Sequence, residues 1–176
     1  MRGSTGPAKL APMTANHPQP AWAAQSGHVQ LPPPEAADPA QAADRLAIAE
    51  CIHRYGWGYD ERDREALGGC FTADGIWEGS IMGVDAIEPH VGRDAVVDFL
   101  TGFWAVQTDQ RRHIFTNVVV SNIDGSTAVA HAYLLLTAAS DKVMTPVTTG
   151  PYRLEMRKVD GVWRIARLMA GFDAPF

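Results

Sequence analysis

The sequence predicts an α+β protein in which helices pack on one face of a curved antiparallel sheet. Apolar residues between about 38 and 106 recur mainly at helical spacing, and beyond residue 110 the period changes from 3.6 to 2. Asp-Gly pairs at 124–125 and 160–161 stand between β-rich runs, and this dipeptide is a strong local signal for a hairpin. Helices and strands that occur in separate blocks are typical of an α+β fold.

Composition excludes several classes of protein. The chain has 176 residues, of which 46% are hydrophobic, enough for one packed domain. Its 15 Lys and Arg against 20 Asp and Glu give a formal net charge of −5, which disfavours binding to nucleic acid. No apolar run approaches the ~20 residues that span a bilayer, and no secretory signal is evident. We therefore expect a cytoplasmic protein that binds neither nucleic acid nor membrane.

The two cysteines, Cys51 and Cys70, are too few for a disulfide framework or a four-ligand zinc site. We expect both to be small buried apolar residues. Residues 1–37 are rich in Pro, Ala, Gly and Gln, and their large apolar residues stand singly. Such a segment cannot bury enough surface to offset its chain entropy. It is predicted to be a disordered arm, or a loose strap on a neighbouring subunit, ahead of a domain at 38–176.

The first helix is predicted over about 39–60. Asp38 can accept a hydrogen bond as its N-cap, and Pro39 suits the first helical position. One face of this helix is apolar, and it carries Leu46, Ile48, Ile52, Tyr55 and Tyr59.

Two further helices and one strand are predicted before the hairpins. Asp63 can cap a short helix over 64–70, and residues 75–81 alternate as a strand does. Residues 84–91 contain Pro89 and are predicted to be a loop. A third helix is predicted over 92–106, with apolar positions at Val96, Phe99, Leu100, Phe103 and Trp104.

Two hairpins complete the predicted fold as a four-stranded meander, with strands over 111–123, 126–140, 146–159 and 162–172. A two-residue turn fixes which residues of a hairpin face each other. If Asp124 and Gly125 form the turn, the facing pairs are His113 with Leu136, Phe115 with Leu134, and Asn117 with Ala132. On the other face, Val118 stands opposite His131, which we expect at the surface or at an interface.

One face of the predicted sheet is apolar and is the natural core face. It carries Phe115, Leu134, Leu136, Leu154, Met156, Ile165 and Met169. His113 and Arg167 are predicted to point into it, where a polar group is costly unless it is paired. The opposite face must be wet or form a polar interface, because it carries Arg153, Glu155, Arg157 and Arg164.

Five motifs, taken in order, carry a family resemblance. They are Tyr55-x3-Tyr59-Asp60 with Asp63, Phe71-Thr72-x-Asp74, Gly92-Arg93-Asp94-Ala95, Arg112-His113-x2-Thr116-Asn117-Val118-Val119-Val120, and Asp160-Gly161-Val162-Trp163-Arg164-Ile165. Over about residues 40–172 the chain resembles the SnoaL-like family of the nuclear-transport-factor-two-like superfamily. The resemblance implies a cone: a strongly bent antiparallel sheet wrapped by three N-terminal helices, with a pocket inside.

The resemblance also implies a chemistry. Members of this family eliminate, isomerise or cyclise small apolar molecules without a cofactor, as dehydratases, dehydrohalogenases, isomerases or polyketide cyclases. It implies no metal, a homo-dimer or homo-trimer, and a small apolar polyketide, steroid or aromatic ring as substrate. The alternative is a non-catalytic ligand-binding or assembly module, such as the β subunits of ring-hydroxylating dioxygenases. That alternative predicts Asp60 and His113 too far apart to hydrogen-bond, or a pocket filled by Leu134, Leu136 and Met156.

The matched catalytic pair is Asp60 and His113, with Tyr55 one helical turn before the aspartate. If the pair meets, Asp60 accepts the proton of one ring nitrogen and leaves the other nitrogen as a base. Tyr55 could then donate a hydrogen bond to a substrate oxygen. The alternatives are a core histidine satisfied by a helix carboxylate, and a core tyrosine on the apolar stripe.

Eight further residues are candidates for binding the substrate: Tyr59, Trp77, Phe103, Trp104, Phe115, Asn117, Tyr152 and Arg167. The aromatic members would line an apolar pocket, although plain core packing is the alternative. Arg167 could balance the charge of an enolate or pair with a buried acid.

Overall fold

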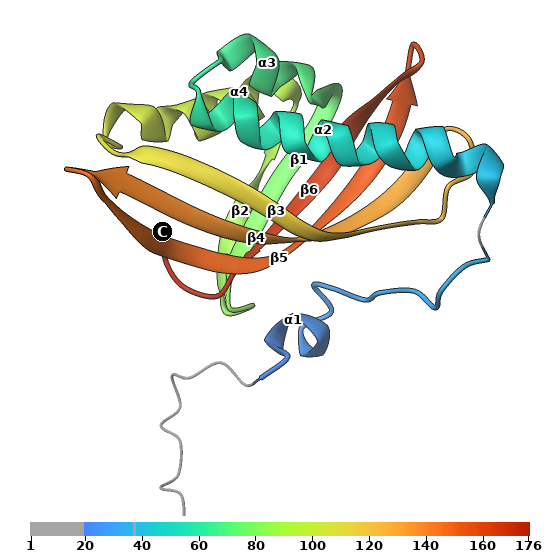
Figure 1. Cartoon of the computed structure of the whole chain (residues 1–176), viewed down its shortest axis with the longest axis horizontal. Helices are drawn as coiled ribbons and strands as arrows, with labels where there is room; N and C mark the ends of the chain where they lie inside the picture. The colour runs from blue at the N-terminus through green and yellow to red at the C-terminus, as the bar shows by residue number, and fades with distance from the viewer. Residues whose placement is uncertain (1–19, 37) are drawn as a thin grey trace, which may run out of the picture.

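The structure, a computed structural model, describes residues 20–36 and 38–176. Helices and strands follow one another in blocks along the chain (Figure 1). In chain order the elements are α1 (Trp22–Gln25), the 3₁₀ turn η1 (Pro39–Gln41), α2 (Ala42–Asp60), α3 (Arg64–Gly69), β1 (Phe71–Ile81), β2 (Asp85–Val91), α4 (Arg93–Gly102), the 3₁₀ turn η2 (Phe103–Ala105), β3 (Gln110–Ser121), β4 (Thr127–Ser140), β5 (Val143–Val159) and β6 (Val162–Phe172).

The six strands form one curved sheet in the order β2-β1-β6-β5-β4-β3. β1 runs parallel to β6, and all other neighbours are antiparallel. The helices α2, α3 and α4 lie on the same side of this sheet (Figure 1). The predicted α+β class is therefore confirmed. Among the described residues, no helix is both long enough and apolar enough to cross a membrane.

Local signals place the helix starts as predicted. An oxygen of Asp38 accepts a hydrogen bond from the Ala40 backbone at 2.9 Å, and Asp63 accepts one from Ala66 at 2.9 Å. The predicted apolar face of α2 needs one correction, because Leu46 is 73% exposed. Two residues span about 200° on a helix, so Leu46 and the fully buried Ile48 cannot share a face.

The loop predicted over 84–91 is wrong, because Asp85–Val91 form the edge strand β2. Pro89 is tolerated there because an edge strand leaves one row of backbone groups unpaired. It also falls where the register against β1 shifts, between the pairs Trp77–His90 and Gly79–Ile87.

The β3–β4 hairpin contains a bulge that the sequence analysis did not place. Asn117 has a φ of 53°, and the register shifts between Thr116 and Val119. Beyond the bulge, His131 pairs with Val119 rather than with the predicted Val118. Before the bulge the prediction is confirmed, since His113 pairs with Leu136. Residues 122–126 lie outside the strands, so the turn is longer than predicted. The bulge at Asn117 shifts the register back, so that His113 still pairs with the predicted residue.

A register shift in the β5–β6 hairpin reverses one predicted face. Leu154 pairs with Leu168, so Leu168 lies in the core and is fully buried. Arg167 consequently leaves the core face, and the prediction that it points into the core is wrong. Its Nε and Nη2 atoms instead donate to the two carboxylate oxygens of Glu78 at 2.8 and 2.9 Å. The same shift moves Met169 off the core face.

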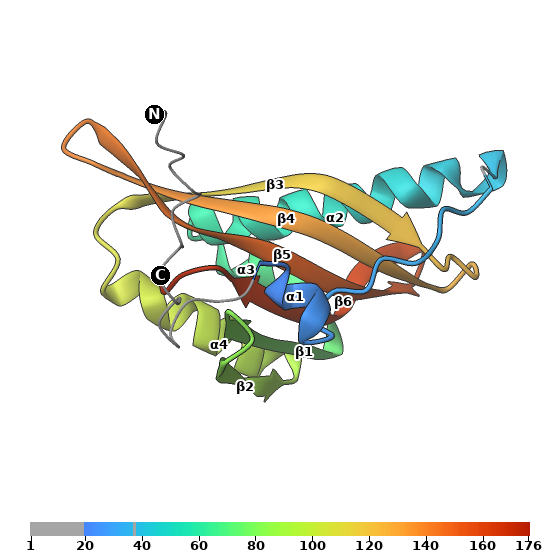
Figure 2. The same cartoon turned by 90° about the horizontal axis from the view of Figure 1, so that it is seen from below.

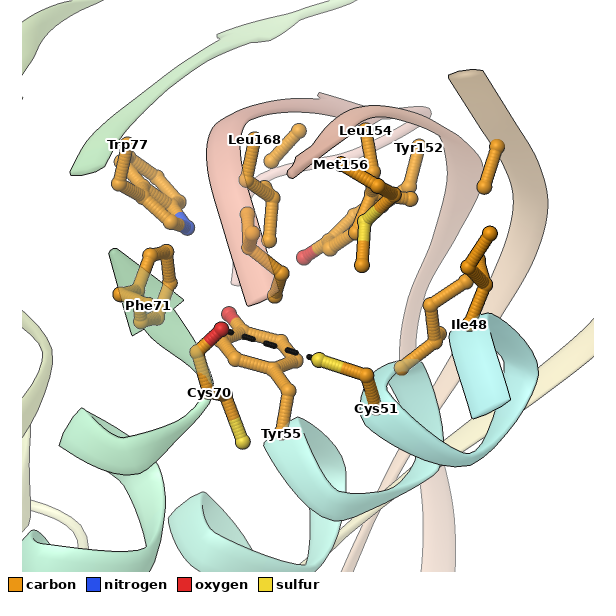
Figure 3. Packing of buried hydrophobic residues seen from close by; sticks show 14 of the residues in the cluster. Ile48, Cys51, Tyr55, Cys70, Phe71, Trp77, Tyr152, Leu154, Met156 and Leu168 are labelled. Atoms are coloured by element: carbon orange, nitrogen blue, oxygen red, sulfur yellow. Dashed lines mark hydrogen bonds between the residues drawn. The ribbon is translucent and has the colours of Figure 1, made fainter. Parts of the chain in front are cut away.

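Buried side chains from α2 and the sheet form the core beneath the helices (Figure 3). Cys51 and Cys70 belong to it, with exposures of 6% and 4%, and both are free thiols. The Cys51 thiol donates a long hydrogen bond to the Cys70 carbonyl, with Sγ and O 3.7 Å apart. The prediction that both cysteines are small buried apolar residues is confirmed.

Residues 20–36, called here the N-terminal segment, have defined contacts with the domain (Figure 2). The Trp22 indole N–H donates to Asp173 Oδ1 at 2.7 Å, and Glu35 accepts from the Asn122 backbone at 2.8 Å. His28 is buried. Residues 20–36 therefore contact the domain through polar groups that are remote in the sequence. The rest of that prediction, residues 1–19 and 37, lies outside the described residues.

Candidate active site

Asp60 and His113 meet at the end of α2. The His113 Nδ1–H donates to Asp60 Oδ1 at 2.6 Å, and the His113 backbone N–H donates to Asp60 Oδ2 at 2.7 Å. Their side chains are only 6% and 7% exposed, respectively. The structure thus brings together the two residues that the sequence predicts as a pair.

Gly56 lets α2 approach β3 closely enough for this pair to form. A Cβ placed on Gly56 would lie 3.2 Å from His113 Cβ and 3.3 Å from Phe115 Cε2. A side chain there would therefore hold the helix away from the strand, one turn before Asp60. Sequence reasoning did not single out Gly56, because the need for a small residue arises only from the packing.

The Asp60 carboxylate determines which ring nitrogen of His113 can act as a base. A carboxylate only accepts hydrogen bonds, so Nδ1 carries the proton and Nε2 keeps a free lone pair. Nε2 makes no hydrogen bond to any residue in the described part of the chain. The pair can consequently take a proton from a bound molecule and return it, which is general acid–base chemistry.

His113 borders a cavity between the helices and the sheet. Its walls are formed by Tyr55, Tyr59, Trp77, Phe99, Leu100, Phe103, Gln107, Arg111, His113, Leu136, Tyr152, Phe172 and Phe176. The enclosed volume is about 30 Å³, whereas sites for small organic ligands usually have roughly 300–1,000 Å³. A ring substrate therefore requires part of the wall to move. Phe176, which packs on Phe172, is the most exposed aromatic side chain in that wall, at 41%.

Aromatic rings surround the imidazole. The Tyr59 ring centre lies 4.8 Å from that of His113, and the Tyr55 ring lies 6.2 Å away. The Tyr59 hydroxyl donates to Gln107 Oε1 at 3.0 Å. Such a setting favours an apolar or aromatic ligand.

Burial keeps the neighbouring phenols protonated. Desolvation raises the pKa of Tyr55 well above its ordinary value, and it does the same for the pKa of Tyr152. The Trp77 indole N–H faces the Tyr55 hydroxyl and opposes the rise, without reaching hydrogen-bond geometry. Both tyrosines can therefore act only as hydrogen-bond donors or acceptors, not as bases.

Four predicted binding residues are not part of the cavity wall. Phe115 packs between Tyr55 and Tyr152, with ring centres 6.0 and 5.5 Å away, and so belongs to the core. Trp104 packs edge-on against Tyr59 at 6.0 Å, outside the wall. The other two, Asn117 and Arg167, lie in the β3 bulge and on the opposite sheet face respectively.

Several wall residues escaped the sequence analysis as site residues: Phe99, Leu100, Gln107, Arg111, Leu136, Phe172 and Phe176. Arg111 was accessible to sequence reasoning, because it stands two residues before His113 and alternate residues of a strand share a face. Phe172 reaches the cavity as the last residue of β6, and Phe176 through the path of the chain after β6, for which the sequence gives no local signal.

His131 lies on the opposite sheet face from His113, as predicted, but it is only 4% exposed. Its two ring nitrogens have no hydrogen-bond partner in the described residues, and it does not border the cavity. Within residues 20–36 and 38–176, no group of three or more His, Cys, Asp or Glu residues is arranged to hold a metal ion.

Two larger hollows lie away from the Asp60–His113 pair. One, of about 650 Å³, lies between α2, α3 and the β5–β6 turn. The other, of about 710 Å³, lies between the N-terminal segment and strands β3 to β5. Neither is bordered by Asp60 or His113. A third hollow, of about 360 Å³, is bordered by Asp60 and Arg111 but not by His113. The smaller cavity is therefore the one that the base His113 borders.

Comparisons with known proteins agree with the fold. A family model described as a SnoaL-like domain matches residues 40–169. A function-unknown protein from Mycobacterium tuberculosis, solved as an Asp-to-Asn variant, is 26% identical, with a TM-score of 0.67 over 80% of this chain and 79% of that one. A protein from Catenulispora acidiphila, solved in complex with S-DNPA, is 28% identical, with a TM-score of 0.65 over 76% of this chain and 96% of that one.

A third structure shows the likeness in fold alone. The beta subunit of a putative aromatic-ring-hydroxylating dioxygenase from Novosphingobium aromaticivorans is 18% identical, with a TM-score of 0.67 over 79% of this chain and 94% of that one. A comparison with curated proteins found no match.

Proposed function

This chain belongs to the SnoaL-like family, and we propose that it is a cofactor-independent lyase or isomerase that moves a proton on a small apolar ring. The substrate class is a polyketide, steroid or aromatic ring compound. One observation carries the proposal: the buried Asp60–His113 hydrogen bond, which leaves Nε2 free beside an aromatic cavity.

Each member of the pair has a role that its position supports. His113 Nε2 takes a proton from a carbon of the substrate, and the ring becomes an imidazolium. The Asp60 carboxylate stabilises that charge from the other side and prevents the ring from turning. The proton then returns to a different carbon in an isomerisation, or to a leaving group in an elimination. Proton transfer of this kind typically contributes ~10²–10⁴-fold to a rate.

A purely structural role explains the pair less well. Buried polar groups in folded proteins almost always have partners, and Asp60 provides one for only one of the two ring nitrogens of His113. Here only Nδ1 is bonded, and the ring borders a cavity lined by aromatic side chains. Such an arrangement is typical of a site in which a ligand supplies the missing contact.

The alternative of a non-catalytic binding or assembly module is favoured by one observation, the small volume of about 30 Å³. This alternative predicts that Asp60 and His113 are too far apart to hydrogen-bond. In the structure, His113 Nδ1 and Asp60 Oδ1 are 2.6 Å apart. Its prediction of a pocket filled by aliphatic residues fits in part: Leu136 is in the wall, but aromatic rings provide most of it.

A homo-dimer or homo-trimer remains a prediction from the family resemblance. The arginines that suggested a polar interface have partners in their own chain. Arg153 pairs with Glu155 at 2.7 Å, and Arg157 pairs with Asp74 at 3.0 Å. These arginines therefore give no independent support for an interface, and native mass spectrometry of the full chain would measure the assembly.

The proposal is tested by deuterium exchange. The protein is incubated in D₂O with a panel of cyclic ketones that includes 1-tetralone, and exchange at the carbon next to the carbonyl is followed by NMR. We expect His113→Ala to lower the exchange rate by ~10²-fold or more while the circular dichroism spectrum stays unchanged. His131→Ala, a buried histidine on the opposite sheet face, is the matched control and should keep the rate.

An unchanged exchange rate in His113→Ala would remove the catalytic proposal. Binding of panel members without any enzymatic exchange in the wild-type protein would favour the non-catalytic module instead.

A further inference from the structure

A second polar side chain of β3 reaches the cavity. Arg111 precedes His113 by two residues, and alternate residues of a strand project from the same face. Arg111 pairs with Ala138 and His113 pairs with Leu136 across the β3–β4 ladder. Both side chains border the cavity, and that of Arg111 is only 14% exposed. Arg111 therefore lines the same cavity as the base.

The Arg111 guanidinium is satisfied on one side only. Nε and Nη2 donate to the two carboxylate oxygens of Asp109 at 2.5 and 3.3 Å. Nη1 is buried and has no hydrogen-bond partner among the residues that the structure describes. A buried donor without an acceptor is costly, so this nitrogen is a candidate for contact with a ligand.

The indole N–H of Trp77 is a second donor in the same wall. Trp77 is 2% exposed, and its Nε1 has no hydrogen-bond partner in the described chain. The side-chain oxygen of Gln107 is already used by the Tyr59 hydroxyl. Because the Trp77 N–H faces the Tyr55 hydroxyl, the unused donor in this wall is that of Arg111, and its natural partner is an acceptor oxygen on the ligand.

The charges around Arg111 favour a neutral acceptor. Asp109 already balances the guanidinium, and Asp60 places a further carboxylate beside His113. A ligand that is permanently anionic would add a third negative group to a mostly buried site, which is unfavourable. A carbonyl oxygen accepts a hydrogen bond without that cost.

We propose that Arg111 is the oxygen-binding residue of the His113 site, where its Nη1 donates to the carbonyl oxygen of a ring ketone. The inference rests on the proposed function. His113 Nε2 takes the proton from the carbon next to the carbonyl, the C–H electron pair forms a C=C bond, and the C=O π pair moves onto oxygen. Arg111 donates to the enolate oxygen, and return of the proton to carbon reverses the electron flow without oxidation or reduction.

Arg111 thereby takes the charge-balancing role that was predicted for Arg167, which lies on the opposite sheet face. Tyr55 is 2% exposed and borders the cavity, so its predicted role as a hydrogen-bond donor stays a prediction.

Binding of two ligands of the same shape tests the inference directly. Affinities for 1-tetralone and for tetralin, which lacks the oxygen, are measured by isothermal titration calorimetry on the full chain. We expect the wild-type protein to prefer 1-tetralone about tenfold or more, as for a hydrogen bond from a charged donor. Arg111→Met should bring the two affinities together, and Arg111→Lys should restore part of the preference. The matched control is Arg112→Met, because Arg112 is about half exposed and pairs with Glu61.

The outcomes separate this inference from the proposed function. His113→Ala should retain the preference for 1-tetralone and lose the exchange reaction. The same preference in Arg111→Met as in the wild type would overturn the role of Arg111 and leave that of His113 intact. Binding of neither ligand to the wild type would overturn the assignment of a neutral ring ketone. Circular dichroism of Arg111→Lys and Arg111→Met verifies that the comparison uses folded protein.

Discussion

The carboxylate of Asp60 holds His113 at two points, the backbone N–H and the ring Nδ1–H, at 2.7 and 2.6 Å. One group thus fixes both the position of the strand and the tautomer of the imidazole. The histidine cannot change its proton arrangement without disturbing the join between α2 and β3. Because one contact is to the backbone and the other to the ring, a substitution can change the chemistry while the fold is kept.

Asp60→Asn should preserve the fold and abolish most of the chemistry. An asparagine oxygen can still accept from the His113 backbone, but its NH₂ group then faces Nδ1 and forces the proton onto Nε2. Nε2 would no longer be a base, so we expect the exchange rate of 1-tetralone to fall by ~10²–10⁴-fold with little change in Tm. Asp98→Asn, at an exposed position paired with Arg64, is the control. A rate near that of the wild type in Asp60→Asn would contradict the tautomer argument.

Gly56→Ala should impair the site more than it impairs the fold. Alanine favours a helix over glycine by about 1 kcal/mol, whereas overpacking against His113 and Phe115 costs roughly 1–3 kcal/mol. We expect a small fall in Tm and a clear fall in exchange rate, because the helix must shift relative to the strand. Gly69→Ala is the matched control, since a Cβ there meets no atom within 4 Å. Equal exchange rates in Gly56→Ala and the wild type would show that the close approach is dispensable.

Phe176→Ala should ease entry to the cavity. Phe176 is 41% exposed and contacts Phe172 and Phe103, with ring centres 4.4 and 6.1 Å away. Since the enclosed volume is only about 30 Å³, we expect removal of this ring to raise the association rate of 1-tetralone in stopped-flow measurements of tryptophan fluorescence. Val106→Ala, at a position 76% exposed and outside the wall, is the control. An association rate that does not change would place the entrance elsewhere.

Docking of the N-terminal segment should weaken in mild acid. Burial lowers the pKa of His28 below its ordinary 6.5; the nearby Pro151 and Met169 carbonyls and Glu78 oppose this shift, and Arg153 reinforces it. As the pH falls, His28 is protonated at a higher pH in the undocked segment than in the docked one. Docking is therefore fully stabilised above about pH 6.5 and loses stability as the pH falls below that value.

Hydrogen–deuterium exchange of the backbone measures this dependence. The amides of Ser26 and Val29 are hydrogen-bonded within the segment and report its order. After correction for the intrinsic effect of pH, we expect their protection to fall between about pH 7 and 5. His28→Leu should remove the dependence on pH. A loss of protection in His28→Leu that matches the wild type would assign the effect to another group.

Features that depend on neighbouring residues in the chain could be predicted. Asp38 and Asp63 cap helices because an N-cap needs only an acceptor and the following backbone. The turn at Asp160-Gly161 was likewise readable from a dipeptide that tolerates positive φ, and both residues have it. The pairing of His113 with Leu136 was also correct, although the turn was longer than expected and the bulge at Asn117 compensated for it.

Features that depend on the sheet as a whole could not be predicted. One register shift in β5–β6 moved Arg167 from the core face to Glu78, because every residue beyond a bulge changes face. The strand character of 85–91 depends on β1 lying beside it, not on its own composition. The N-terminal segment could not be read as ordered, since its partners Asn122 and Asp173 are remote in sequence.

The candidate site was predictable in part, for a similar reason. Asp60 and His113 came from the family resemblance, and the alternation of β3 could have added Arg111. Gly56 and Phe176 carry no signal of their own, because their importance lies in what they pack against.

The contact between Trp22 and Asp173 bears on how the protein should be handled. It brings the N-terminal segment to the residues that precede Phe176, whose ring forms part of the cavity wall. A purification tag or sensor-chip linkage attached after Phe176 would crowd both this wall and the N-terminal segment. Immobilisation through the exposed Asp124–Gly125 turn, at the far end of the sheet in Figure 1, leaves both of them clear.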